Sequence, residues 1–341
     1  MNTITYGLDL AKNIFHVHAV TSKGEIEIKK KLRRKEVLAF FAKREPGLIG
    51  MEACGGSHYW ARELTRLGYT ARLMSPQFVK PYIKGNKNDA NDAEGICEAV
   101  TRPNMRFVAV KSSAQQDILM LHRVRTQRIK QRTALANQTR GLLSEYGIVI
   151  PIGISNVRKH LIDILTDADE KRLSEFVRPH FNSLYEELLH IDGLVKEIDV
   201  ALKTYFNTSK DCQRLASLPG VSVITATALV GYLGDVSNFN NGRELAAYLG
   251  LVPRQHSTGG RELLLGISKR GDSYLRTLLI HGARSVLKAA SEKKDKDSLW
   301  LMNLHARRGY NKAAVGQANK TARRIWALLS NETQYEVKQA A

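Results

Sequence analysis

The 341-residue sequence is poor in cysteine and has no long apolar run. Its three cysteines, Cys54, Cys97 and Cys212, lie far apart and form no CxxC pair, so they predict reduced, buried thiols and neither a zinc site nor a disulfide framework. No apolar run reaches the roughly 18 residues that a membrane-spanning helix needs. The N-terminus, MNTITYGLDLAK, lacks a basic segment followed by an apolar one, which predicts no signal peptide, no membrane partner and a cytoplasmic location.

Acidic residues are also scarce relative to basic ones. Lys and Arg number 52 against 33 Asp and Glu, which gives a formal net charge of +19. An excess of this size predicts a polyanionic partner, and the lack of a membrane signal favours nucleic acid over an anionic membrane surface. Apolar residues make up 43% of the chain, enough for packed cores, and the length allows two or more domains.

The first hundred or so residues alternate between strand and helix patterns. In TITYGLDL, one face holds Ile4, Tyr6 and Leu8, and the other holds Thr5, Gly7 and Asp9. The segments IFHVHAV and IEIKKKL complete a three-strand meander, and alternating helices and short apolar strands follow. We therefore predict an α/β domain with a mixed sheet over residues 1–110.

The next segment, 111–207, has a long-helix pattern. It contains the continuous stretch DILMLHRVRTQRIKQRTALANQTRGLLSEYG, then a break at GIVIPIGIS, then a second long helix. The second helix carries an apolar heptad seam made of Leu184, Leu188, Ile191, Val195, Ile198, Leu202 and Tyr205. An antiparallel hairpin, a dimerising coiled coil and an ordinary bundle core all fit this pattern.

The remainder, 208–341, predicts a mostly helical domain. LASLPGVSVITATALVGYLGD gives the order helix, Pro-Gly turn, helix, which is typical of a helix-hairpin-helix whose turn amides face a phosphate backbone. The glycine also fits a simple helix cap. Further along we expect a helix, an exposed loop at PRQHSTGG, a basic loop and another helix.

Four acids stand out in the first domain. Asp9 lies on the polar side of the first strand, Glu52 ends the strand GLIGME, and Asp89 and Asp92 fall three residues apart at the start of a helix. Carboxylate oxygens are the ligands that Mg²⁺ prefers, and paired ions can clamp both oxygens of a phosphodiester displacement. Taken singly, Asp89 also suits an N-cap, Asp92 a first helical turn, and Asp9 an ion pair with Lys12.

Two basic regions fit nucleic acid. The helix after residue 111 carries Arg123, Arg125, Arg128, Lys130 and Arg132 with few acids nearby in sequence, although a solvated helix face is the ordinary alternative. The loop around Ser257 is glycine-rich and has cations on either side at Arg254, Arg261, Lys269, Arg270 and Arg276. A serine in such a loop forms a turn, binds phosphate or acts as a nucleophile.

These motifs resemble a known family. YGLDLAK, GMEACGG and KNDANDAEGI are similar to the three acidic motifs of the DEDD insertion-sequence transposases, the bridge-RNA-guided recombinases with an RNase H-like (RuvC-like) domain. LPGVSVITATAL, AAYLGLVPRQHSTGG and GISKRGDSYLRTLLIHGA resemble that family's C-terminal transposase domain. The resemblance covers nearly the whole chain and implies Mg²⁺ ligands at Asp9, Glu52, Asp89 and Asp92.

The same resemblance implies a mechanism and partners. Ser257 would attack the scissile phosphate, although the family more often has Ser-Gly than STGG, and Thr258 carries a second hydroxyl. A structured guide RNA would pair with donor and target DNA, and a dimer or tetramer would build a composite active site. One alternative is a Mg²⁺-dependent RuvC-like nuclease or junction resolvase in which water attacks. Another is a protein that binds nucleic acid without cutting it.

Overall fold

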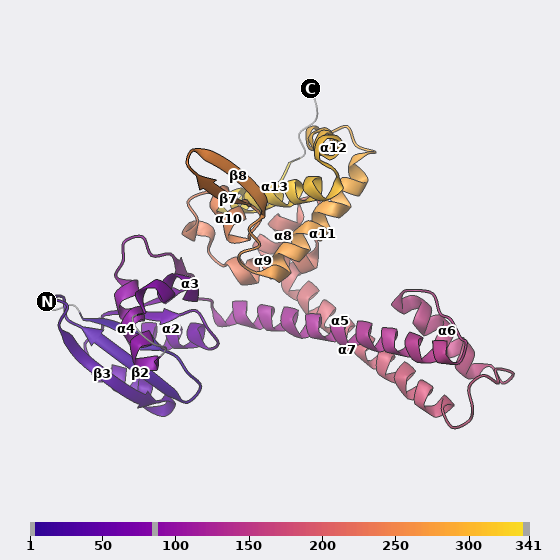
Figure 1. Cartoon of the computed structure of the whole chain (residues 1–341), viewed down its shortest axis with the longest axis horizontal. Coiled ribbons are helices and arrows are strands. Elements are labelled where there is room, and N and C mark those ends of the chain that lie inside the picture. The colour runs from indigo at the N-terminus through magenta and orange to yellow at the C-terminus, as the bar shows by residue number, and fades with distance from the viewer. Residues whose placement is uncertain (1–3, 84–87, 337–341) are drawn as a thin grey trace. The chain divides into compact units, whose positions relative to one another are not determined.

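The computed structural model describes residues 4–83 and 88–336, so Lys87, the first residue of KNDANDAEGI, lies outside the described residues. The chain divides into two compact units, Met1–Ser113 and Ala114–Ala341 (Figure 1). None of the described helices is long and apolar enough to cross a membrane. The further division of the second unit at residues 207 and 208 stays a prediction.

A six-stranded mixed sheet forms the centre of the first unit. Its order is β3-β2-β1-β4-β5-β6. The strands are β1 (Thr5–Asp9), β2 (Ile14–Val20), β3 (Ile26–Arg33), β4 (Leu48–Glu52), β5 (Thr70–Met74) and β6 (Phe107–Val108). The predicted meander is confirmed, since β1, β2 and β3 pair antiparallel, while β4 and β5 continue from β1 in parallel. This mixed α/β sheet is consistent with an RNase H-like domain.

Helices cover both faces of that sheet. On one face Tyr6 and Leu8 pack with Phe41 of α1 (Val37–Ala42) and Trp60 of α2 (Ser57–Arg66). The other face lies under α4 (Asp89–Val100), next to the short elements α3 (Pro76–Val79) and η2 (Lys80–Tyr82). A Cβ on Gly7 would lie 2.1 Å from the Ala93 carbonyl oxygen. The missing side chain therefore lets α4 approach β1 closely.

The second unit begins with three helices, α5 (Ser113–Glu145), α6 (Ile154–Thr166) and α7 (Arg178–Thr208). Ion pairs join Arg125 to Asp199 and Arg132 to Asp192, so α5 and α7 run antiparallel. Buried residues of the predicted seam pack against α5 and α6 within the chain: Leu188, Ile191 and Val195. Of the three alternatives the intramolecular hairpin is therefore formed, with α6 as an unpredicted third member. A coiled coil between copies stays a prediction.

The rest of the second unit is mostly helical, as predicted. Its helices are η3 (Val236–Asn238), α8 (Lys210–Ala216), α9 (Val223–Leu233), α10 (Gly242–Tyr248), α11 (Ser273–Ala290), α12 (Lys296–Arg308) and α13 (Tyr310–Asn331). The Pro-Gly turn between α8 and α9 packs on α11, because a Cβ on Gly282 would lie 2.0 Å from the Gly220 carbonyl oxygen. Glycine is thus required at this contact, and a phosphate contact of the turn stays a prediction.

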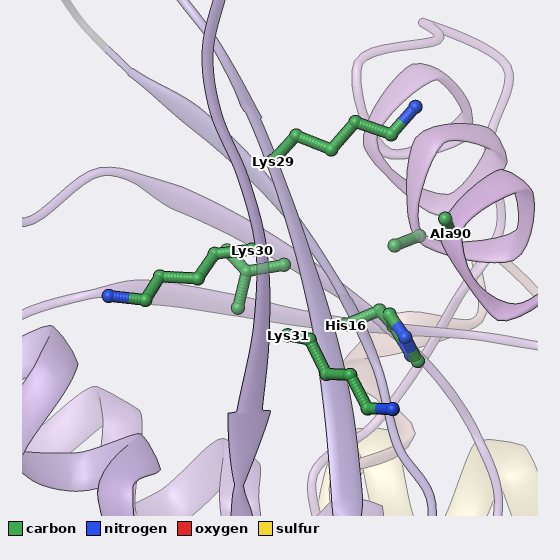
Figure 2. A pocket seen from close by; sticks show the side chains of 7 residues that line it. His16, Lys29, Lys30, Lys31 and Ala90 are labelled. Carbon is green, nitrogen blue, oxygen red and sulfur yellow. The ribbon is translucent and has the colours of Figure 1, made fainter.

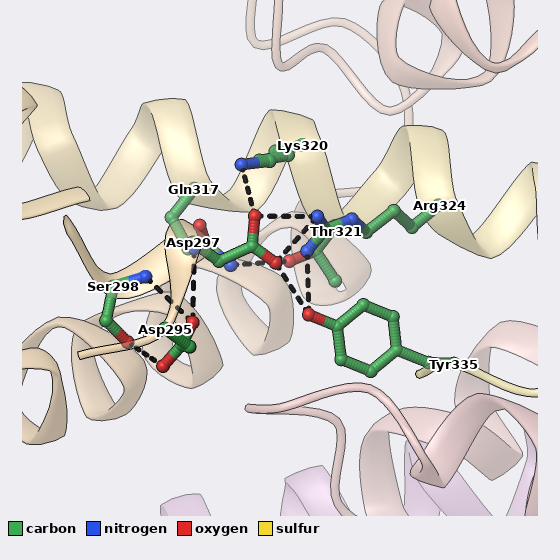
Figure 3. Close-up of polar contacts among 8 residues, drawn as sticks. All are labelled: Asp295, Asp297, Ser298, Gln317, Lys320, Thr321, Arg324 and Tyr335. Carbon is green, nitrogen blue, oxygen red and sulfur yellow. Dashed lines mark hydrogen bonds and ion pairs between the residues drawn. The ribbon is translucent and has the colours of Figure 1, made fainter. Parts of the chain in front are cut away.

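A partly buried carboxylate ties the end of the described chain to these helices (Figure 3). Asp297 accepts hydrogen bonds from Lys320 at 2.7 Å, Arg324 at 2.8 Å and the Tyr335 hydroxyl at 2.6 Å. The Tyr335 amide also donates to the Ser217 hydroxyl at 3.0 Å. Burial alone would raise the pKa of Asp297, but the hydrogen bonds outweigh it and lower the pKa to about 2. Asp297 therefore stays ionised at neutral pH.

The predicted exposed loop at PRQHSTGG is wrong in one respect. It is a two-stranded antiparallel hairpin of β7 (Pro253–Thr258) and β8 (Arg261–Ile267). Gly259 and Gly260 have φ values of 56° and 78°, the left-handed pair that a tight type I′ turn requires. All of β7 and nearly all of β8 is exposed, so the hairpin has little support from a core.

Candidate functional site: an acid cluster and a serine hairpin

Parallel pairing of β1 with β4 brings two predicted acids to one edge of the sheet. The register places Leu8 opposite Met51, so Asp9 and Glu52 follow at neighbouring carboxyl ends. Both acids alternate onto the face that α4 covers, the same face as Gly7 and Gly50. Strand alternation and the pairing of β1 with β4 together therefore position half of the predicted ligand set.

Helix α4 supplies the other two acids from its first turn. Asp89 is the first helical residue, and the side chain of the preceding Asn88 caps the helix by accepting from the Ala90 amide at 3.0 Å. The alternative in which Asp89 is the N-cap is therefore wrong. Because Asn88 satisfies the helix end, the carboxylates of Asp89 and Asp92 remain available for another partner.

Three of the four carboxylates converge. One oxygen each from Asp9, Asp89 and Asp92 lies within 4.8 Å of the others. Glu52 is outside that group, but it lies near enough for the charges of the group to raise its pKa. Burial, followed by the charges of Asp92 and Asp89, raises the pKa of Asp9, and burial followed by Asp9 and Asp92 raises that of Glu52.

This arrangement fits a divalent cation. The donors are carboxylate oxygens from a strand end and a helix start. Hard cations such as Mg²⁺ and Mn²⁺ prefer oxygen ligands, whereas softer metals prefer nitrogen or sulfur. The raised pKa values of Asp9 and Glu52 report mutual repulsion and desolvation, both of which a bound cation relieves. The cluster is therefore a candidate site for a hard divalent cation.

Sequence reasoning assigned no role to His16, which the structure places beside this cluster. His16 pairs with Asp9 across β1 and β2, and its Nδ1 lies 3.8 Å from an Asp89 oxygen. It also borders a small pocket between β3 and the start of α4, together with Lys29, Lys30, Lys31 and Ala90 (Figure 2). The available signal was the alternation in IFHVHAV, which puts His16 on the same sheet face as its cross-strand neighbour Asp9.

Ser257 lies on the exposed hairpin of the second unit. Its hydroxyl accepts a hydrogen bond from the Gln255 side-chain amide at 2.9 Å, and it stands opposite Glu262 in the ladder. Successive side chains of a strand point to opposite faces, so Ser257 and Thr258 face opposite sides of the hairpin. A single site on one face can therefore use only one of these hydroxyls.

The cations predicted around Ser257 differ in their surroundings. Arg254, Arg261 and Arg270 are exposed. Lys269 has φ of 53°, a conformation that non-glycine residues seldom adopt. Arg276 donates to the carbonyl oxygens of Leu249 at 3.3 Å and Arg270 at 3.0 Å, so it braces the base of the hairpin.

The basic helix α5 also divides into two groups. Arg125 and Arg132 pair with acids of α7, with N–O distances of 2.5 Å and 2.7 Å. These acids come from a distant segment, so the scarcity of acids nearby in sequence does not leave these two arginines unpaired. Arg123 and Lys130 are exposed and Arg128 is partly so, and for these three a nucleic-acid contact stays a prediction.

Comparison with known proteins adds a family. A model of DEDD transposases of the IS110 group, described as "Transposase", matches residues 6–148, and the "Transposase IS116/IS110/IS902 family" matches residues 212–297. The two matched ranges include every acid of the cluster and the serine hairpin.

Full-length relatives agree. The chain is 46% identical to a "Probable family 20 transposase" of Pseudomonas aeruginosa, over 98% of this chain and 99% of that protein. It is 44% identical to the "Transposase for insertion sequence element IS1111A" of Coxiella burnetii, over 96% and 90%. It is 37% identical to the "Transposase for insertion sequence element IS1328" of Yersinia enterocolitica, over 97% and 98%. The chain therefore belongs to the IS110/IS116/IS902 family of insertion-sequence transposases.

Proposed function

We propose that this transposase cuts and rejoins DNA strands through a serine–phosphate intermediate, with Mg²⁺ held by Asp9, Glu52, Asp89 and Asp92. The observation that carries the metal role is the convergence of three carboxylates from β1 and α4 within 4.8 Å. A structural role for these acids would call for cationic side chains as partners. Within residues 4–83 and 88–336, His16 is the basic side chain that lies against the cluster.

In the proposed chemistry each group has one task. The four acids hold the cation, which would polarise the scissile phosphate and stabilise charge that develops on its oxygens. The Ser257 oxygen forms a bond to phosphorus as the bond to a deoxyribose oxygen breaks, and the leaving oxygen takes a proton. The exposed arginines of the hairpin, Arg254 and Arg261, would bind neighbouring phosphates.

The partners follow from charge and from the family. The net charge of +19 supports a nucleic-acid partner, and transposition requires donor and target DNA. We also propose a structured guide RNA, a dimer or tetramer, and a composite site in which the serine and the acids come from different copies. The exposed Arg123 and Lys130 and the partly exposed Arg128 of α5 are our candidates for the backbone contacts.

Adduct trapping tests the serine step. The purified protein is mixed with RNA transcribed from DNA next to its gene, Mg²⁺ and labelled donor and target DNA, then separated on a denaturing gel. We expect a slow protein–DNA band that is lost in Ser257→Ala and in Asp92→Asn. Thr258→Ala serves as the matched control, because it removes the adjacent hydroxyl from the other face of the hairpin and leaves the band in place.

A water-dependent nuclease is the second candidate, and one observation favours it. The Ser257 hydroxyl is bonded to a neutral amide, and within residues 4–83 and 88–336 neither a histidine nor a carboxylate hydrogen-bonds to it. A hydroxyl without a base is a weak nucleophile until the assembled site activates it. Cut DNA without an adduct, unchanged by Ser257→Ala, would establish this alternative.

A further inference from the structure

The pocket beside the acid cluster belongs to the edge strand of the sheet. In the ladder, Lys31 pairs with His16 and Lys29 pairs with His18, so both lysines share the face on which Asp9 lies. Ala90 and Ala93, in the first turns of helix α4, also border this pocket. The pocket and the acid cluster are contiguous through His16, whose Nδ1 lies 3.8 Å from the Asp89 carboxylate.

The lysines of this pocket lack an acidic partner in the described part of the chain. Within residues 4–83 and 88–336, neither the Lys29 nor the Lys31 ammonium forms an ion pair, and both side chains are exposed. Figure 2 shows both extending toward the α4 side of β3, while Lys30 extends to the opposite side. The Lys30 ammonium lies 5.5 Å from the centre of the Phe40 ring, in the layer of α1. Alternation therefore gives the α4 face two cations that are available to a ligand.

The size and chemistry of the pocket select a small anion. Its volume is about 190 Å³, smaller than the roughly 300–1,000 Å³ of pockets that enclose whole organic ligands. Two ammonium groups and an imidazole offer donors for phosphate oxygens but no planar fork that would read a base. Such a site binds backbone without regard to sequence.

Electrostatics explains why such a site belongs here. Four carboxylates repel a DNA strand, and a bound cation compensates only at the phosphate it contacts. The neighbouring phosphates of the strand still meet the negative cluster unless fixed positive charge lies beside it. Lys29 and Lys31 supply that charge on the same face of the sheet, one strand beyond His16.

We propose that Lys29, Lys31 and His16 form a subsite for a backbone phosphate of the DNA strand that the acid cluster cuts, adjacent to the scissile phosphate. The subsite rests on the proposed function, because it presumes that the strand reaches the acids. It holds the strand across the edge strand β3 and adds affinity and register, while the chemistry belongs to the acids. The lysines are positioning residues.

Lysine footprinting of the full-length chain tests the site directly. The protein is acetylated briefly, alone and with a 20-nucleotide DNA strand from the end of the insertion element, and modification is read by mass spectrometry. We expect DNA to reduce acetylation of Lys29 and Lys31 several-fold and to leave Lys30 unchanged. An RNA strand of the same sequence is the second arm, and protection by RNA alone would overturn the assignment to the cut DNA strand.

Paired variants give an independent measurement. Each backbone contact to a single strand contributes about 0.7 to the slope of log affinity against log salt, so Lys29→Gln with Lys31→Gln should lower the slope by about 1.4. The matched control, Lys30→Gln with Lys43→Gln, removes the same charge from the α1 side of the sheet and should change the slope by less than half as much. Equal slopes for the two pairs would overturn the proposal.

Strand cutting separates this proposal from the function beneath it. The lysine pair should raise the DNA concentration needed for half-maximal cutting and leave the rate at saturation within about threefold, as loss of uniform binding predicts. If Asp92→Asn still cuts, the proposed function fails whatever the lysines do. The subsite alone fails if Asp92→Asn is inactive, DNA does not protect Lys29 and Lys31 from acetylation, and their substitution leaves the salt slope unchanged.

Discussion

The acid cluster and the serine hairpin differ in how firmly the fold holds them. The acids stand on the ends of buried strands and on a helix that packs closely against β1 through Gly7. Ser257 stands on a two-stranded ribbon whose leucines, Leu263 and Leu264, are 56% and 65% exposed. Isolated two-stranded hairpins are marginally stable in water. The acids are thus held by a packed core, whereas the serine stands on a ribbon that has little core to hold it.

The sharpest way to break this comparison is at the serine. Ser257→Ala should abolish the protein–DNA adduct, while Thr258→Ala should retain most of it, since the two side chains face opposite sides of β7. The adduct band on a denaturing gel measures both. An adduct that survives Ser257→Ala and disappears in Thr258→Ala would assign the nucleophile to the other face of the hairpin.

The acids should give the next largest effect. Asp92→Asn removes one charged oxygen ligand and keeps the side-chain volume. Mutating groups that only hydrogen-bond to metal ligands typically lowers activity by about 10- to 100-fold, so we expect a larger fall in strand cutting here. The rate of cutting at saturating Mg²⁺ is the measurement. Asp117→Asn, an acid of α5 outside the cluster, is the control and should cut at the wild-type rate.

Two glycine substitutions sharpen the contrast in packing. Gly7→Ala places a Cβ 2.1 Å from the Ala93 carbonyl oxygen and should destabilise the first unit by about 2–3 kcal/mol, as overpacking does. Gly266→Ala on β8 meets no atom within 4 Å and should change stability by less than about 0.5 kcal/mol. Urea denaturation of each variant checks the pair, and equal effects would mean that the hairpin is as tightly packed as the sheet.

The smallest expected effect concerns pH and metal. The pKa values of Asp9 and Glu52 are raised on folding, so their ionisation opposes folding, and metal-free protein should lose stability as pH rises above about 4. At pH 7, Asp9→Asn should therefore melt a few degrees higher without metal and gain less from added Mg²⁺ than the wild type. Thermal melts with and without Mg²⁺ provide the measurement, and an equal Mg²⁺ gain in both proteins would contradict a metal site at Asp9.

The position of each acid on its own element followed from the sequence because strand alternation is a local rule. That Asp9 and Glu52 share one face and one edge needed the pairing of β1 with β4, which joins segments about forty residues apart and which the structure shows. The predictions that failed concern which groups each residue contacts. The cap of α4 is Asn88 because it precedes the first helical residue, and helix boundaries are uncertain by a residue or two from sequence.

Other failures came from the second unit. The salt partners of Arg125 and Arg132 lie 74 and 60 residues away, beyond the reach of any sequence window. The pair Gly259-Gly260, between a six-residue and a seven-residue strand, indicated a hairpin around Ser257. The glycines were instead interpreted as part of a phosphate-binding loop. Helix α6 was missed because the apolar run before it dominated the pattern.

The hydrogen bonds of Tyr335 have a consequence for the gene. A stop codon at this position would remove the hydroxyl that donates to Asp297 and the amide that donates to Ser217. Asp297 would keep its hydrogen bonds from Lys320 and Arg324. The bond that joins residue 335 to Ser217, at the end of α8, would be lost. A frameshift just upstream of Tyr335 that spares every residue of the acid cluster and the serine hairpin would therefore still remove both bonds, so residues outside the two sites also carry structural information.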